Sequence, residues 1–260
     1  MSSKKKSSIL ISNYNNETYL DRCITSCKRQ KYENLEIIVH DDISTDNSQA
    51  KLKSCSGIKN FFNEKKTNKP FLDAMNGYKK IYTHSSGEYI FLLDSDDYFL
   101  DNKVLSIINL FEKNIDVDFI QDIPTVHRNG TYKKNSNNFY LSRWPFFSPT
   151  SCLAFRKAFF EEFLIYIEDN EMLYENVWLD FRLCAFAYFK SKKFLSLDKS
   201  FTIYEQSLVG NEAKKYGFLG KNWIKRRYKS HLYVNFLEGL KNKNNNIDAS
   251  ITKIIYKIFD

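Results

Sequence analysis

Short apolar runs alternate with amphipathic stretches along the first half of the chain. The apolar runs are only a few residues long, so they predict buried β-strands at 8–12, 35–39, 58–62 and 89–93. The stretches between them repeat apolar residues at helical spacing and predict helices at 20–30, 46–54, 71–83 and 104–111. Apolar strands that are separated by helices are typical of a parallel sheet covered on both faces. The predicted fold class is therefore α/β with a mainly parallel sheet.

Polar residues cluster where three of these predicted strands end. The clusters are Ser12–Asn15, Asp41-Asp42 and Asp94–Asp97. Ligands of parallel α/β sheets bind outside the carboxyl ends of the strands, so we expect the clusters to line one crevice. The ring of Tyr14 could stack on a base there, and a carboxylate such as Asp42 could accept from a pyrimidine N–H. A packed tyrosine and ordinary turn residues are the structural alternatives.

The acidic run Asp94–Asp97 directly follows an apolar strand. Carboxylates so close together repel one another, so the run is either a solvated turn or the site of a divalent cation. Hard cations bind carboxylate and phosphate oxygens readily. Neither G-x-G-x-x-G nor G-x-x-x-x-G-K-[ST] occurs after the first strand, which argues against a Rossmann dehydrogenase and a P-loop enzyme.

The second half of the chain has a less regular pattern. Phe119–Ile123 predicts an edge strand that ends at Pro124. The polar, asparagine-rich stretch 128–143 predicts a loop or hairpin over the crevice. The remaining predicted elements are helices at 157–167 and 177–189 and short strands at 194–197 and 201–204.

The composition fits a globular protein with a sizeable core. Of the 260 residues, 43% are hydrophobic and 16% aromatic, whereas 8 glycines and 4 prolines are too few for a loop-rich β-sandwich. No signal peptide is predicted, and no apolar run approaches the roughly 20 residues of a membrane span. Five scattered cysteines without zinc-site spacing predict reduced, mostly packed thiols, as in a cytoplasmic protein.

The net charge of +8 is concentrated in the last fifth of the chain. Residues 211–260 hold about 11 Lys or Arg against about 4 Asp or Glu. Most of this tail is predicted to be helical, with an Asn/Lys linker at 242–246 and a last amphipathic stretch at 251–259. Three interpretations are open: a solvated helix face, docking to an anionic membrane surface, or a clamp in which Arg226 or Arg227 reaches a diphosphate. Nucleic acid is not a predicted partner, because no recognised module accompanies the charge.

Two motifs carry a specific family resemblance. The N-terminal signature of the family 2 glycosyltransferases resembles residues 11–48, ISNYNNETYLDRCITSCKRQKYENLEIIVHDDISTDNS, and its acidic metal motif resembles residues 87–97, GEYIFLLDSDD. The resemblance is strong to about Leu110, thinner to about Tyr204, and does not cover the basic tail. It implies the GT-A fold, a Rossmann-like, mainly parallel sheet flanked by helices.

The resemblance also implies ligands for the polar clusters. It implies a nucleotide-sugar donor, in particular a UDP-sugar, and Mn²⁺ or Mg²⁺ as the cofactor. The metal would be held by Asp96 and Asp97 and would neutralise charge on the departing diphosphate. The implied nucleotide-binding residues are Ser12, Tyr14, Asp42, Asp94 and Asp96.

An inverting sugar transferase needs a base for the acceptor hydroxyl. By resemblance the usual base position falls on Asn176, which cannot accept a proton at neutral pH. Asp180, one helical turn further on the same face, or the adjacent Glu175 could substitute as the catalytic residue. An ion pair of Asp180 on its own helix is the structural alternative. The histidine that often serves the family as a third metal ligand has no counterpart after Tyr204, and His231 is predicted to lie on the surface.

These features together predict a metal-dependent inverting glycosyltransferase. Its acceptor would be a glycan or lipid-linked glycan of a bacterial surface, so contact with the inner face of the cell membrane is an open option. The predicted domains are 1–210, with a nucleotide-binding half to about 115 and an acceptor half from there, and a helical basic C-terminal extension at 211–260. Asn176 motivates a competing prediction, a non-catalytic nucleotide-sugar-binding subunit of a glycan-assembly complex.

Overall fold

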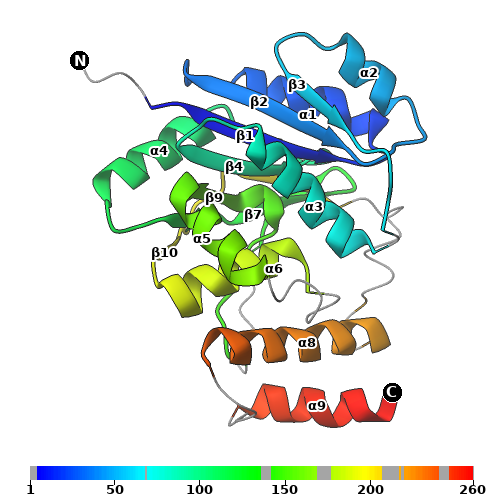
Figure 1. Ribbon diagram of the computed structural model, residues 1–260, viewed down its shortest axis with the longest axis vertical. Helices are drawn as coiled ribbons and strands as arrows, with labels where there is room; N and C mark the ends of the chain where they lie inside the picture. The colour runs from blue at the N-terminus through cyan, green and yellow to red at the C-terminus, as the bar shows by residue number, and fades with distance from the viewer. Residues whose placement is uncertain are drawn as a thin grey trace.

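A seven-stranded, mainly parallel sheet forms the centre of the fold (Figure 1). The computed structural model describes residues 5–67, 69–135, 142–168, 177–206, 217, 220–239 and 246–259. The strand order is β10-β6-β9-β4-β1-β2-β3. The strands are Ser7–Asn13 (β1), Leu35–Asp41 (β2), Lys59–Phe62 (β3), Tyr89–Asp94 (β4), Phe119–Gln121 (β6), Leu153–Arg156 (β9) and Phe194–Ser196 (β10). As predicted, β1 to β4 run parallel, whereas β9 is antiparallel to both of its neighbours.

Strand β6 lies inside the sheet, so the predicted edge strand at Phe119–Ile123 is wrong. It pairs with β9 on one side and with β10 on the other. Pro124 does not end the β-structure either, because it is the first residue of another strand, Pro124–Arg128 (β7). A missing N–H is tolerated at that position.

A second, smaller sheet contains β7 and has the order β5-β11-β7-β8. Its other strands are Tyr98–Phe99 (β5), Thr202–Glu205 (β11) and Thr131–Lys134 (β8). β7 and β8 form a hairpin whose two turn residues, Asn129 and Gly130, have φ of 49° and 77°. Positive φ at both positions is the signature of a type I′ turn, which matches the twist of the strands. The stretch 128–143, predicted to be a loop or hairpin, thus contains the second half of a hairpin that begins at Pro124, and its residues 136–141 lie outside the described residues.

Helices cover both faces of the large sheet (Figure 1). They are Glu17–Lys28 (α1), Ser48–Ser54 (α2), Pro70–Thr83 (α3), Lys103–Lys113 (α4), Lys157–Glu168 (α5) and Leu179–Ala185 (α6), which a π-helical segment, Phe186–Ser191 (η2), continues. Successive side chains of a strand point to opposite faces. Ile9 and Ile11 of β1 therefore pack with residues of α1 and α4, and Leu10 packs with residues of α3, α5 and α6.

Helix α3 approaches β2 closely at Gly77. A Cβ built on Gly77 would lie 2.5 Å from Nδ1 of His40, whose ring is fully buried. Real Cβ atoms do not come this near to a ring, so only glycine allows this packing distance between helix and strand.

Of the two C-terminal helices, one contributes to the core and the other packs on its outer side. Helix α8 (Lys221–Leu237) contacts α6 and η2, and its Tyr233, Val234 and Leu237 belong to the core that contains α3 and α5. Helix α9 (Ile247–Phe259) packs on the outer side of α8 at one end of the molecule (Figure 1). None of the described helices has the length and apolar character of a membrane span.

A buried ion pair joins α9 to α8. His231 is fully buried with its Nε2 3.0 Å from the Asp248 carboxylate, so the prediction of a surface histidine is wrong. Arg227 donates to the same carboxylate through Nε, at 2.8 Å, and through Nη2. Arg227 is therefore engaged at the helix–helix contact. Of the five cysteines, Cys55 is partly exposed and the other four are buried and unpaired, as predicted.

Candidate active site

Three strands bring the predicted polar clusters to one edge of the sheet. In the parallel register Ser12 of β1 lies opposite His40 on β2 and Asp94 on β4. Beyond the strand ends, the N–H of Asp42 donates to Asn13 O at 2.9 Å and that of Ser95 donates to Ser12 O at 3.0 Å. The three polar clusters therefore meet at the carboxyl ends of adjacent strands, as expected.

Asp41, at the end of β2, is held by hydrogen bonds within the protein. Its fully buried carboxylate accepts from Asn13 Nδ2 at 2.7 Å, from the N–H and hydroxyl of Ser44 at 3.0 and 2.6 Å, and from Gln49 Nε2 at 3.0 Å. With both oxygens satisfied by these donors, Asp41 has a structural role in shaping the loop after β2.

The neighbouring Asp42 faces a small corner with an exposed aromatic ring. Its carboxylate accepts from Asn63 Nδ2 at 2.9 Å and lies 3.6 Å from Lys66 Nζ. The same ammonium lies 3.2 Å from the ring centroid of Tyr14, which is 50% exposed. A ring face, an acceptor and a cation thus meet at one strand end, a combination that suits a planar base carrying an N–H and a negatively charged tail.

The carboxylates of the acidic loop lack sufficient neutralising partners. Burial, followed by the charge of Asp96, raises the pKa of Asp94 to about 7, although Tyr78 donates to it at 2.8 Å. Burial, with Glu205 adding to it, raises the pKa of Asp96 to about 6. Burial and the charges of Asp96 and Asp94 also raise the pKa of Asp97 well above its usual range. A hard divalent cation would relieve this repulsion, so the residues present fit a metal of that class.

The three carboxylates differ in how open they are. Asp97 is fully buried, and its oxygens accept from the hydroxyl of Ser151 and from the N–H of Glu205 at 2.8 Å. Asp96 is partly exposed, and within the described ranges only its own backbone N–H donates to its carboxylate. Asp96 can therefore bind a ligand without competing with a protein donor, whereas each oxygen of Asp97 already accepts one protein hydrogen bond. Among the described residues no three His, Cys, Asp or Glu side chains form a ready-made metal site.

A buried lysine holds the residues on which the acidic loop rests. Lys103 is fully buried, and its ammonium donates to Asp122 Oδ1 at 2.8 Å, to Ser151 O at 2.7 Å and to Thr202 Oγ1 at 2.6 Å. Ser151 belongs to the 3₁₀ turn Thr150–Cys152 (η1), and its hydroxyl also accepts from the N–H of Asp94 at 3.0 Å. The Lys103–Asp122 pair thereby fixes the residue that contacts both ends of the acidic loop.

Strand β11 forms another wall of the site. Burial and the charges of the three loop carboxylates and Asp180 raise the pKa of Tyr204 above its usual range, so its hydroxyl stays protonated and can donate. The next residue, Glu205, accepts from Arg22 Nη2 at 2.8 Å and lies 2.8 Å from His127 Nδ1. Arg22 also donates to Asp96 O at 2.9 Å, which ties α1 to the acidic loop.

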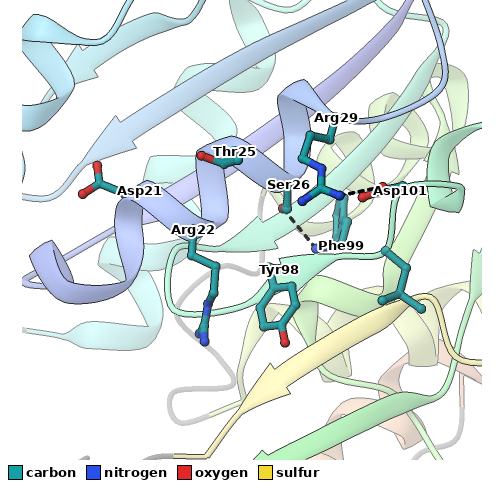
Figure 2. Close-up of a pocket in the computed structure, with 9 residues that line it drawn as sticks. Asp21, Arg22, Thr25, Ser26, Arg29, Tyr98, Phe99 and Asp101 are labelled. Atoms are coloured by element: carbon teal, nitrogen blue, oxygen red, sulfur yellow. Dashed lines mark hydrogen bonds and ion pairs between the residues drawn. The ribbon is translucent and has the colours of Figure 1, made fainter.

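The outer side of Arg22 faces a groove between α1 and β5. Figure 2 shows Arg22 and Tyr98 projecting toward the same side, with the guanidinium 4.4 Å from the ring centroid. The groove has a volume of about 630 Å³ and also includes Asp21, Thr25 and Arg29. None of the loop carboxylates lines this groove, so it is distinct from the acidic site.

Asp180 reaches the acidic site from the first turn of α6. It is partly buried, its Oδ1 accepts from the N–H of Phe181 at 2.7 Å, and its charge contributes to the raised pKa of Asp94. Among the described residues no Lys or Arg forms an ion pair with Asp180, so the ion-pair alternative is wrong. The other candidate base, Glu175, and Asn176 lie outside the described residues.

Several residues of the site were not predicted from the sequence. They are Arg22, Lys66, Tyr78, Lys103, Ser151, Tyr204 and Glu205. Most of them act through partners far away in the chain, and no local motif marks them. Tyr204 ends a predicted strand and Glu205 directly follows it, which is the one signal that could have placed them at this sheet edge.

Comparisons with known proteins bear on what this site does. The family model described as Glycosyl transferase family 2 matches residues 8–192. An uncharacterized glycosyltransferase of Haemophilus influenzae is 35% identical over 116 residues, which are 41% of this chain and 42% of the relative. WfgD of Escherichia coli, a UDP-Glc:alpha-D-GlcNAc-diphosphoundecaprenol beta-1,3-glucosyltransferase, is 33% identical over 139 residues, 53% of this chain and 49% of the relative. The chain therefore matches less than half the length of either relative.

Solved structures extend the likeness to nearly the whole chain. TarS 1–349 of S. aureus in complex with UDP-GlcNAc has a TM-score of 0.63 and 17% identity, covering 98% of this chain and 71% of that chain. The mannosyltransferase PcManGT of Pyrobaculum calidifontis in complex with GDP-Man and Mn²⁺ has a TM-score of 0.57 and 12% identity, covering 99% of this chain and 70% of that chain. At these identities the likeness concerns the fold, and it confirms the predicted GT-A class.

Proposed function

This chain belongs to glycosyl transferase family 2, and from that membership we propose that it transfers a sugar from a UDP-sugar to a lipid-linked glycan acceptor with Mn²⁺ or Mg²⁺. The observation that supports this most is the acidic loop. Its carboxylates have raised pKa values and lie at the same sheet edge as the corner of Tyr14, Asp42 and Lys66. Charge and shape there suit a metal–diphosphate beside a base.

Relatives and neighbours support the donor class. WfgD is named for UDP-Glc, and TarS is seen with UDP-GlcNAc. PcManGT, seen with Mn²⁺, supports the metal. We propose that Tyr14 and Asp42 contact the uracil and that Ser12 and Asp94 contact the ribose.

We assign the metal to the open carboxylate of Asp96. Asp97 is the second ligand implied by the family resemblance, but both of its oxygens already accept protein hydrogen bonds, so we assign it the task of holding the loop. A cation bound at Asp96 would supply Lewis-acid stabilisation of the departing diphosphate. The protonated hydroxyl of Tyr204 faces the same charges and can donate to them.

Asp180 is the base in this proposal. Its carboxylate takes the proton of the acceptor hydroxyl, the hydroxyl oxygen forms a bond to the anomeric carbon, and the bond to the diphosphate breaks with its electron pair leaving on UDP. Attack from the opposite face inverts the anomeric centre. Asp180→Asn is expected to abolish transfer while UDP still binds; near-normal turnover of this variant would move the role to Glu175.

The acceptor class and the location follow from the relatives' printed names. WfgD and a Campylobacter jejuni glucosyltransferase that is 30% identical over 107 residues, 40% of this chain and 33% of the relative, both act on undecaprenol-linked glycans. A lipid-linked acceptor is presented at a membrane surface. We therefore propose that the protein works in the cytoplasm at the inner face of the membrane and that its basic tail faces anionic lipid.

A thermal-shift panel tests the donor and the metal together. UDP, GDP, CDP and TDP are each added with and without Mn²⁺. A ligand at 100 times its Kd adds roughly 2.7 kcal/mol of stability, which is easily measured. We expect a response to UDP that requires Mn²⁺ and is lost in Asp96→Asn. No response to any nucleotide would contradict the proposal, and UDP binding without acceptor-dependent UDP release would favour the binding-subunit alternative.

A further inference from the structure

We propose that helix α9 is a membrane anchor whose exposed isoleucines insert into an anionic phospholipid bilayer. The residues concerned are Ile247, Ile251, Ile254 and Ile258, which we call the isoleucine face. This inference takes its partner from the proposed function, in which the acceptor is lipid-linked. The inference adds to the proposed function in two ways. It identifies the isoleucine face as the surface that contacts the membrane, and it attributes binding to apolar insertion as well as to charge.

The isoleucine face is continuous and exposed to solvent. The exposed fractions are 64% for Ile247, 47% for Ile251, 63% for Ile254 and 75% for Ile258. At 3.6 residues per turn these positions fall within about 60° of the helix circumference. Single exposed apolar residues are common, but four β-branched side chains in one stripe are not explained by chance exposure.

The opposite side of α9 is fixed to the protein. Asp248, Ala249 and Thr252 are buried, and Tyr256 stacks on Tyr228 of α8 with ring centroids 4.5 Å apart. The Asp248 carboxylate accepts from Arg227, and α8 is part of the core. The helix is therefore held as a formed element with its apolar stripe outward, so insertion would not require the segment to fold on the membrane.

Charge decides what the isoleucine face contacts. Lys253 and Lys257 are exposed and lie along one side of the stripe. The acidic residue among the described positions of α9, Asp248, is buried and paired with Arg227 and His231. In a dimer through this face no described acidic side chain of α9 would neutralise the lysines of the partner copy. Anionic headgroups neutralise them, and an apolar stripe beside lysines is the pattern of a helix lying in the membrane interface.

Vesicle flotation tests this proposal directly. The probe is a vesicle of phosphatidylglycerol and phosphatidylcholine in equal parts, with pure phosphatidylcholine as the reference. We expect binding of the wild type to the anionic vesicles, and Ile254→Gln combined with Ile258→Gln to lower the partition coefficient roughly tenfold to a hundredfold per inserted residue. Glutamine keeps the charge and is a good helix former, so the loss would report on insertion.

A matched double variant controls for lost surface hydrophobicity. Ile115 and Ile165 are 78% and 74% exposed and lie elsewhere on the molecule. Ile115→Gln combined with Ile165→Gln is expected to bind vesicles like the wild type. Lys253→Gln combined with Lys257→Gln is expected to weaken binding at low salt by roughly fivefold per lysine. At high salt this lysine variant should still bind vesicles measurably, whereas the isoleucine variant should not.

The outcomes separate this inference from the proposed function. No vesicle binding by the wild type, or equal binding by wild type and the α9 isoleucine variant, would overturn the anchor. A wild type that is dimeric by light scattering and becomes monomeric in the isoleucine variant, with vesicle binding unchanged, would also overturn it and assign the face to a second copy. The UDP–Mn²⁺ thermal shift does not depend on α9, so either proposal can fail while the other stands.

Discussion

Acidic residues stand at the ends of two apolar strands in this protein, and the two groups differ in the hydrogen-bond donors that surround them. Asp41 at the end of β2 is surrounded by donors from Asn13, Ser44 and Gln49. At the end of β4, Asp94 and Asp96 face mainly each other and other carboxylates, and their pKa values are raised to about 7 and about 6.

The difference teaches how to separate a structural acid from a functional one. Where donors satisfy both oxygens, the carboxylate stabilises the fold. Where burial raises the pKa and donors are few, the fold is destabilised by the charge and a ligand is expected to relieve it. Substitution should therefore change stability in opposite directions at the two strand ends.

The largest effect is expected for Asp96→Asn. The change removes the proposed metal ligand, and kcat/KM should fall by roughly a thousandfold or more, since metal ions supply several kcal/mol to such reactions. Without ligands the thermal midpoint of unfolding should stay equal or rise, because the substitution removes a negative charge that repels the neighbouring carboxylates. A radiochemical transfer assay and a thermal melt measure the two. A variant that is less stable and fully active would contradict the distinction between the structural acid after β2 and the functional acids after β4.

Asp41→Asn should instead lower stability by about 2 to 3 kcal/mol. An amide places its own donors against those of Ser44 and Gln49 and leaves buried groups unsatisfied. Urea unfolding at neutral pH measures the change. The neighbouring Asp42→Asn is the control: we expect less than about 1 kcal/mol of lost stability there, with weaker UDP binding. Equal losses of stability at the two positions would contradict the distinction.

A third acid, Asp248, tests the effect of cationic partners. Burial alone would raise its pKa, but hydrogen bonds from His231 and Arg227 outweigh it and lower the pKa to about 2. Because the folded pKa lies below the unfolded one, this stabilisation is fully present above about pH 4 and is lost as the pH falls through 2. Asp248→Asn should cost about 2 kcal/mol at neutral pH.

The pH dependence provides the check on that value. The gap in unfolding free energy between wild type and Asp248→Asn should narrow between pH 4 and pH 2, as measured by urea unfolding at each pH. A gap that stays constant down to pH 2 would mean that the charge of Asp248 does not contribute.

The smallest effect is expected for Ser151→Ala, at about 1 kcal/mol. The hydroxyl donates to Asp97 and accepts from the N–H of Asp94, so its loss should also weaken Mn²⁺-dependent UDP binding. Ser85→Ala is the matched control, because that buried hydroxyl donates to Tyr82 O at 2.7 Å, away from the acidic loop. It should cost similar stability without changing UDP binding; a loss of UDP binding in both variants would point to a general effect of stability.

Much of the first half could be predicted because its signals are local. The strands β1, β2 and β4 are runs of apolar residues, and the polar clusters stand where those runs stop. The convergence of these clusters at one sheet edge follows from the parallel arrangement. Helix α3 begins at Pro70, a position where the missing N–H of proline is not needed.

The rest depends on partners that are distant in sequence. Lys103 is an ordinary lysine at a helix start until Asp122 and Thr202 surround it. His231 lies in a basic stretch that suggests solvent exposure, but Asp248 supplies its partner from the next helix. The two-residue strand β5 and the polar hairpin of β7 and β8 lack the apolar pattern that marks a strand.

The contact between Gly77 and His40 links two positions of the chain in evolution. A larger residue at position 77 is incompatible with the imidazole, and the imidazole is buried on a strand that leads to the site. The two positions should therefore vary together among descendants of this sequence, with substitution at 77 appearing only where 40 has become smaller. In a library that randomises this half of the protein, positions 40 and 77 should be varied together.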